Sequence, residues 1–344
     1  MTSPALGHSL RTAGLITLAL AVTGCALVSS PHDAAGPTGR LSLTYLQKQA
    51  DQPYFMDEAA GARAKAAELG VDLDVINLGN RGDTTRSELQ KAIERKTNGL
   101  IAVLPDPAEG PDFARTAKEA GIPLLTSDDQ ICTNYPDPGA CFPNDLVPRV
   151  GFSGTGMGKE VGTRAAAEFA RTGWNSADTR ILSVYGHDIP VCGERVHGAL
   201  DAFHGKVPGS TKDLEIWTDN TAANARLKVA LAVTANAGVK HWVVWGCNDE
   251  NVQGAAQALR DAGFGPDNVI GIGIGAGLAC REWLTGKPSA MRAALYIKGK
   301  DVGALAVEKL VTHIRRKQAL PAETLAPTTM VDPTNWQASG LSCT

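Results

Sequence analysis

The chain has 344 residues, of which 43% are hydrophobic and 20% are charged, and its formal net charge at pH 7 is −3. This length exceeds that of an ordinary single domain and predicts two domains. Lysine and arginine are scattered rather than grouped, which argues against a nucleic-acid-binding protein.

The N-terminal segment has the features of an export signal. A weakly basic start with His8 and Arg11 precedes an apolar run over residues 15–22, far shorter than the ~20 residues of a membrane-spanning helix. Small residues then lead to Cys25, in a spacing that resembles a bacterial lipobox. We therefore predict a signal peptide over residues 1–24 and a lipid anchor on Cys25, which places the working protein outside the cytoplasm. The alternative is an ordinary cleaved signal with a cysteine there by chance.

Residues 25–39 are rich in serine, proline, glycine and alanine and predict a flexible tether. Beyond them, short apolar runs alternate with helical periodicity. The first group of elements comprises strands at 41–46, 71–76, 100–104 and 122–126 and helices at 55–69, 84–96 and 112–120. The second group comprises helices at 159–171, 194–203, 222–235 and 251–262 and strands at 181–185, 214–218, 242–245 and 269–274. Segments at 278–284, 293–297 and 302–314 complete the pattern.

Two successive runs of strand–helix units predict an α/β protein with two doubly wound parallel-sheet lobes joined by hinge strands. We expect an N-terminal lobe of residues 40–150 plus 277–317 and a C-terminal lobe of residues 151–276 plus 318–344. The hinge crossings are expected near 150–153, near 274–277 and after about residue 317.

Ligands bind at the carboxyl ends of the strands in such sheets. Polar residues that directly follow a predicted strand are therefore the candidates for lining a cleft between the lobes. They are Lys48, Asp128, Asp129, His187, Asp188, Asn220, Asn248 and Asp249.

Several of these candidates, and a further one, Arg195, have a structural alternative. Asp128 and Asp129 fit acceptors for sugar hydroxyls, an acid/base pair, a metal site or a helix cap. Arg195, one turn into a helix, could hold two ligand oxygens with its fork or form a surface ion pair. Asn220 and Asn248 could each cap the following helix instead.

Two glycine-rich stretches superficially suggest nucleotide binding. Residues 151–160 contain a lysine that is followed by Glu160, where a phosphate-binding loop needs serine or threonine. Residues 271–275 lack the dinucleotide-binding spacing. We interpret the two stretches as a hinge crossover and a close strand–helix turn, and we expect neither cofactor nor metal.

The cysteines indicate disulfide bonds. The chain holds seven cysteines, and those after Cys25 are even in number, which favours disulfides in an exported protein. Cys132 and Cys141 lie close together in a loop rich in proline, glycine and asparagine, and we predict that they pair. The pairing of the other four stays open; Cys192–Cys247 with Cys280–Cys343 is one hypothesis.

Several motifs carry a resemblance to a known family. They are the segments 48–55, 105–107, 128–130, 239–249 and 270–274. Through them the chain resembles, from about residue 41 to 333, the periplasmic pentose- and hexose-binding proteins of ABC importers, most closely their L-arabinose-binding branch. The resemblance implies the type I periplasmic-binding-protein fold.

The resemblance also implies roles for individual residues. Lys48 would donate to the ring oxygen of a sugar or a neighbouring hydroxyl, and Asp128 and Asp129 would accept from hydroxyls. Arg195 would hold the ring oxygen or an adjacent hydroxyl. The amides of Asn220 and Asn248 would contact the sugar from the second lobe.

At four positions the chain departs from the family pattern that the resemblance implies. Tyr54 stands where the arabinose binders stack a tryptophan, and Gln52 replaces a glutamate. Phe152 replaces a methionine beside the carbon that distinguishes pentose from hexose, which favours a pentose-sized ligand. Gly275 stands where relatives carry a polar residue.

The sequence therefore predicts an extracytoplasmic solute-binding lipoprotein, not an enzyme. It would capture an arabinose-like aldopentose or galactose-like aldose and deliver it to the permease subunits of an ABC transporter. We expect a monomer that touches the membrane only through its lipid. One alternative is a sensor that presents the sugar to a membrane receptor. Another is a secreted sugar-processing enzyme, for which adjacent carboxylates fit poorly.

Overall fold

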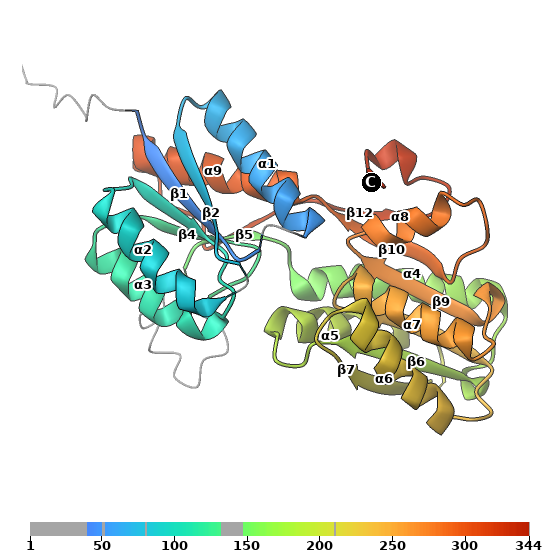
Figure 1. Cartoon of the computed structure of the whole chain (residues 1–344). Coiled ribbons are helices and arrows are strands. Elements are labelled where there is room, and N and C mark those ends of the chain that lie inside the picture. The colour runs from blue at the N-terminus through green and yellow to red at the C-terminus, as the bar shows by residue number, and fades with distance from the viewer. Residues whose placement is uncertain (1–39, 50–51, 80, 132–146, 210, 344) are drawn as a thin grey trace, which may run out of the picture. The chain divides into compact units, whose positions relative to one another are not determined.

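The computed structural model describes residues 40–49, 52–79, 81–131, 147–209 and 211–343. The predicted signal peptide, the tether, Cys25 and the predicted Cys132–Cys141 bond lie outside these residues. The predicted fold class is confirmed, since the described chain forms two mostly parallel sheets, each covered by helices on both faces (Figure 1). Among the helices described, none is long and apolar enough to cross a membrane.

The first sheet is parallel throughout and has the strand order β11-β5-β4-β3-β1-β2. Its strands are β1 (Ser42–Gln47), β2 (Asp72–Asn77), β3 (Gly99–Ala102), β4 (Leu124–Ser127), β5 (Arg149–Gly151) and β11 (Glu323–Leu325). The helices on it are α1 (Pro53–Glu68), α2 (Thr85–Glu94), α3 (Gly110–Glu119) and α9 (Gly299–Arg316). Strand β1 is buried on both faces, because Leu43 and Tyr45 pack in one hydrophobic cluster and Leu46 in another.

The second sheet has the order β12-β10-β9-β8-β6-β7, with only β12 antiparallel to its neighbour. Its strands are β6 (Thr179–Tyr185), β7 (Lys212–Trp217), β8 (His241–Gly246), β9 (Val269–Ile274), β10 (Met291–Ile297) and β12 (Thr328–Val331). The helices on it are α4 (Gly154–Thr172), α5 (Pro190–His204), α6 (Ala222–Ala235), α7 (Asp249–Asp261) and α8 (Gly277–Trp283). Alternating residues of β8 pack towards opposite faces, Trp245 in one cluster and Trp242 in the other.

The predicted boundaries between the lobes were wrong in two segments. Residues 277–297 belong with the second sheet, because β10 pairs with β9. Residues 323–325 belong with the first sheet, because β11 pairs with β5. The chain therefore passes between the sheets after β5, after β10 and after β11. The crossing expected near 274–277 lies instead between β10 and α9, after residue 297.

The glycine-rich stretch after β5 is mostly helical. Helix α4 begins at Gly154, where the Ser153 side chain accepts a hydrogen bond from the Gly156 amide at 3.0 Å and so caps the helix. Its glycines let α5 approach closely: a Cβ atom on Gly158 would lie 2.1 Å from the Arg195 carbonyl oxygen, and one on Gly162 would lie 2.0 Å from that of Ala199.

We expect Gly162→Ala to destabilise the fold by about 1–3 kcal/mol, because the added methyl group meets backbone that cannot move aside cheaply. Gly193→Ala, on α5, is the matched control. The nearest atom to its new Cβ would be 3.9 Å away, so it should be neutral or stabilising by roughly 0.5–1 kcal/mol. Urea denaturation of the two variants checks the contrast, and equal stabilities would contradict the packing described here.

Candidate functional site

A partly buried ion pair lies at the carboxyl ends of the strands of the first sheet. Lys48 follows β1, and Asp129 lies just beyond the end of β4. The Nζ atom of Lys48 is 2.7 Å from Oδ2 of Asp129, and the two side chains are 22% and 16% exposed. The structure thus brings these two residues, both selected because they follow predicted strands, into direct contact.

The pKa values of the two neighbouring carboxyl groups shift in opposite directions. Burial raises the pKa of Asp129, but the charge of Lys48 and its hydrogen bond outweigh burial, so the net pKa is lowered. Burial, followed by the charge of Asp129, raises the pKa of Asp128. Burial lowers the pKa of Lys48, but the carboxylates of Asp129 and Asp128 outweigh it and raise the net pKa. Asp129 is therefore the more acidic carboxyl group of the two.

Asp128 is held in place by two further side chains. The hydroxyl group of Tyr54, in the first turn of α1, donates to Oδ1 of Asp128 at 3.4 Å. Nη1 of Arg149 donates to the backbone carbonyl of Asp128 at 2.7 Å and to that of Phe152 at 3.0 Å. Asp128 has a φ of +59°, an uncommon conformation for a residue other than glycine. Arg149 was missed by the sequence analysis, because no local pattern distinguishes it.

Arg195, on α5, carries a positive charge within electrostatic reach of this cluster. It acts on Lys48, Tyr54, Asp128 and Asp129. One nitrogen, Nη1, donates to the carbonyl oxygen of Cys247 at 2.8 Å. Its Nε atom is buried and has no hydrogen-bond partner among the described residues, although a buried donor normally has one. The guanidinium therefore retains one N–H donor without a partner among the described residues.

The second sheet adds an asparagine network. Asn248 caps α7, because its Oδ1 accepts from the Asn251 amide at 3.0 Å, and its Nδ2 donates to the Asn220 carbonyl at 3.0 Å. The Oδ1 of Asn220 accepts from the Gly186 amide at 2.8 Å. Asn251 is fully buried, and its Nδ2 donates to Oδ1 of both Asn220 and Asn248 at 2.8 Å.

Asn220 and Asn248 each keep donor capacity, since a carboxamide NH₂ group has two hydrogens and each Nδ2 makes one described bond. The cap that we considered as an alternative is present at Asn248, whereas Thr221, not Asn220, caps α6. Asn251 was read from the sequence only as the start of a helix. The one signal for its role was its position three residues after Asn248.

Three further predicted residues contribute no side chain to the hydrogen bonds described above. Gln52 is at the N-cap position of α1, where its side chain makes no capping bond. Phe152 is 2% exposed and packs in a hydrophobic cluster, so its contact with a ligand stays a prediction. Gly275 has a φ of +121° and lies beside Asp249.

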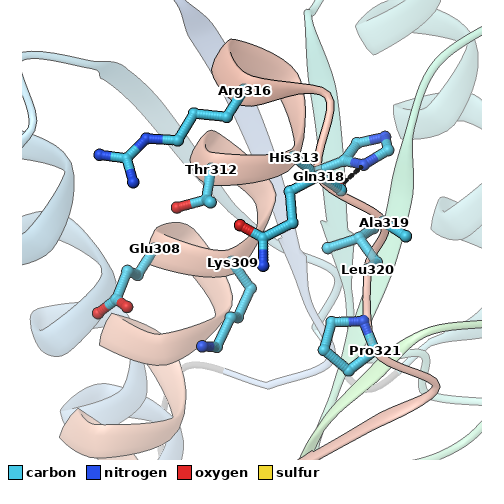
Figure 2. A pocket seen from close by; sticks show the side chains of 9 residues that line it. All are labelled: Glu308, Lys309, Thr312, His313, Arg316, Gln318, Ala319, Leu320 and Pro321. Atoms are coloured by element: carbon cyan, nitrogen blue, oxygen red, sulfur yellow. Dashed lines mark hydrogen bonds between the residues drawn. The ribbon is translucent and has the colours of Figure 1, made fainter.

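A separate hollow is lined by residues between 308 and 321, which are distant in the sequence from the residues above. Figure 2 shows it between α9, through Glu308, Lys309, Thr312 and Arg316, and the segment that follows, through Gln318 and Pro321. Its volume is about 240 Å³, and it includes none of the predicted ligand-binding residues. Within the part of the chain that the structure describes, no group of three or more histidine, cysteine or acidic residues is arranged to hold a metal.

The chain is similar to known proteins over most of its length. The profile of the family described as periplasmic binding protein domain matches residues 43–318. An ABC transporter L-arabinose-binding periplasmic protein of Azospirillum brasilense is 27% identical over 336 residues, covering 96% of each chain. The L-arabinose-binding periplasmic protein of Escherichia coli K12 is 27% identical over 267 residues, covering 75% of this chain and 76% of the relative.

Solved structures share the fold. A periplasmic ribose ABC transporter from Conexibacter woesei superposes with a TM-score of 0.73 at 16% identity, covering 89% of this chain and 96% of that one. A periplasmic solute-binding protein of an ABC transporter from Actinobacillus succinogenes, with bound D-allose, gives 0.71 at 19% identity, covering 87% and 100%.

Proposed function

The chain belongs to the periplasmic binding protein domain family, and on this premise we propose that it captures a monosaccharide outside the cytoplasm and delivers it to the permease of an ABC transporter. The sugar is an arabinose-like aldopentose or a galactose-like aldose. This proposal is supported by the two L-arabinose-binding relatives, which match most of the chain.

The observation that carries the proposal is the polar cluster itself. Lys48 and Asp129 are paired at 2.7 Å at the end of the first sheet. The charge of Arg195, on α5, acts on both, and its Nε has no partner among the described residues. A sugar hydroxyl both donates and accepts. It can therefore donate to Asp129 while its neighbour, or the ring oxygen, accepts from Lys48 or Arg195.

Such a site discriminates between epimers. An inverted hydroxyl leaves one protein group buried without a partner, at a cost of about 1–3 kcal/mol. We further propose that Gln52, Tyr54 and Phe152 border the sugar, and that Asn220 and Asn248 contact it with their remaining N–H groups. Closure of the two lobes about the three crossings would expel water. Sugar shifts that equilibrium only through its higher affinity for the closed form.

The proposal includes a lipid anchor on Cys25 and action as a monomer. A sensor that hands the same sugar to a membrane receptor would use the same residues and differ only in its partner. A sugar-processing enzyme is disfavoured, because the Lys48 ammonium occupies Asp129. Hydrolysis instead needs two carboxyl groups on opposite sides of the scissile bond, roughly 5–10 Å apart.

A ligand screen tests this function. The purified chain is titrated calorimetrically with L-arabinose, D-galactose, D-xylose, D-ribose, L-fucose and D-glucose, and each mixture is then analysed chromatographically for products. We expect at least one sugar to bind with a Kd of about 1 μM or below, equivalent to roughly −8 kcal/mol, and to be recovered unchanged. Absence of binding by all six sugars would overturn the proposal, and a product would favour the enzyme.

A further inference from the structure

A disulfide bond lies directly beside the proposed sugar-binding residues of the second sheet. It joins Cys192, in the first turn of α5, to Cys247, which follows β8, across a sequence separation of 55 residues. The two cysteines are 1% and 4% exposed. The bond thus fixes the start of α5 to the end of β8 inside the protein.

Both sulfur atoms contact side chains of the site. Nη1 of Arg195 lies 3.6 Å from Sγ of Cys247, in addition to its 2.8 Å hydrogen bond to the Cys247 carbonyl. Nδ2 of Asn220 lies 3.5 Å from Sγ of Cys192. Asn248 is the next residue after Cys247. One covalent bond therefore touches or adjoins all three of these proposed ligand-binding residues.

These three residues come from separate segments. Arg195 is on α5, Asn220 follows β7, and Asn248 follows β8. Without the disulfide, the described contacts that would hold Arg195 to the β8 end are its hydrogen bond to the carbonyl of Cys247 and ordinary packing. A single neutral acceptor is a weak restraint for a long side chain with many rotamers.

We propose that the Cys192–Cys247 disulfide is a positioning element of the sugar site, which pre-organises Arg195 and the two asparagines in the ligand-free protein. The inference rests on the proposed function for its effect on affinity. If loss of the bond lets the α5 start and the β8 end separate, only a fraction of the molecules presents all three groups at once. The apparent Kd then rises by the inverse of that fraction.

The chain contains a matched control. The second disulfide, Cys280–Cys343, closes a similar stretch, with a sequence separation of 63 residues. The stabilisation expected from loop closure depends only weakly on such a difference in length. Cys280 and Cys343 lie in the cluster that contains Trp283, Trp336 and Leu341, not in the cluster that contains Cys192 and Cys247.

The test compares C192A/C247A with C280A/C343A in the full chain. Two quantities are measured: the Kd for L-arabinose, by calorimetry, and amide hydrogen exchange without sugar over residues 193–199 and 248–252. We expect C192A/C247A to bind L-arabinose at least tenfold more weakly than the wild type. Its amide hydrogens should also exchange faster in both segments. The second pair should keep both quantities close to the wild-type values, although both pairs lower the melting temperature. If the alanine pair does not fold, C192S/C247S is measured instead.

A further comparison separates positioning from general loosening. In an Arg195→Ala background, removal of Cys192–Cys247 should weaken L-arabinose binding by less than in the wild type, because part of the effect acts through Arg195. Unchanged exchange in both segments, or equal weakening by the two cysteine pairs, would overturn the inference. If the wild type binds none of the six sugars, the proposed function fails, and the exchange measured without sugar still decides whether the bond positions these segments.

Discussion

Asp129→Ala is expected to weaken binding of L-arabinose roughly a hundredfold, which corresponds to about 3 kcal/mol. The change removes a charged acceptor and leaves the Lys48 ammonium, 22% exposed, without the carboxylate that lies 2.7 Å from it. A hydrogen bond to a charged group contributes about 1.5–3 kcal/mol, which sets the size of the expected effect on binding. Calorimetric titration measures the Kd directly.

The control for this experiment is an ion pair on the surface. Lys240 and Asp178 are 2.8 Å apart, but their side chains are 65% and 39% exposed. Such pairs contribute roughly 0–1 kcal/mol, so Asp178→Ala should leave the Kd for L-arabinose within about twofold of the wild type. A folded Asp129→Ala variant that binds L-arabinose as tightly as the wild type would show that the Lys48–Asp129 cluster is not the sugar site.

The alternation of elements was predictable from the sequence because most strands are buried on both faces. Residues 269–274 were predicted as a strand from their apolar run, and β9 has these bounds. The helix starts were less predictable. α4 begins at Gly154, five positions before the predicted start, because its glycines reduce helix propensity but permit the close approach to α5. α5 begins at Pro190, a residue tolerated in the first turn.

The lobe boundaries could not be read from local sequence. The segment 293–297 has the sequence pattern of a strand, and this pattern is the same whichever sheet the strand joins. Which strand it pairs with depends on contacts between residues that are distant in the sequence. β10 adds to β9, so its residues extend the second sheet. The chain then leaves for α9, which packs on the first sheet. The short strand β11 pairs with β5, which precedes it by well over a hundred residues in the chain.

The grouping of the candidate site residues was predictable where a residue follows its strand directly. Lys48, Asp128 and Asp129 were selected by that rule, and the structure brings them together. The rule cannot find residues that act from elsewhere in the sequence. Arg149 holds the Asp128 carbonyl from the start of β5, and Asn251 joins two asparagines from inside α7. Both depend on long-range geometry that has no periodic signature.

A buried carboxyl group that interacts with Asp128 makes the stability of the protein depend on pH. Glu58, on α1, is fully buried. Burial, followed by the negative charge of Asp128, raises its pKa to about 8. Between its ordinary pKa, near 4.5, and this value, the native state holds a proton that the unfolded state has released. The unfolding free energy therefore falls as the pH rises through this window.

Glu58→Gln should abolish this loss of stability, because the amide matches the shape of the protonated acid and does not ionise. The stability of the wild type relative to Glu58→Gln is expected to fall by roughly 3–5 kcal/mol in total from pH 4.5 to 9, since one pKa unit is about 1.4 kcal/mol. Urea denaturation at pH 5.5, 7 and 8.5 measures the difference, in which contributions from other groups cancel.

Asp249→Asn is the matched control for Glu58→Gln. Burial, followed by the charge of Glu250, raises the pKa of Asp249 to about 6, so the stability difference between wild type and Asp249→Asn should stop changing above about pH 7. The difference between wild type and Glu58→Gln should still change between pH 7 and 8.5, because burial and the charge of Asp128 raise the pKa of Glu58 to about 8. A flat difference for Glu58→Gln across that interval would mean that Glu58 is already ionised at neutral pH in the native protein.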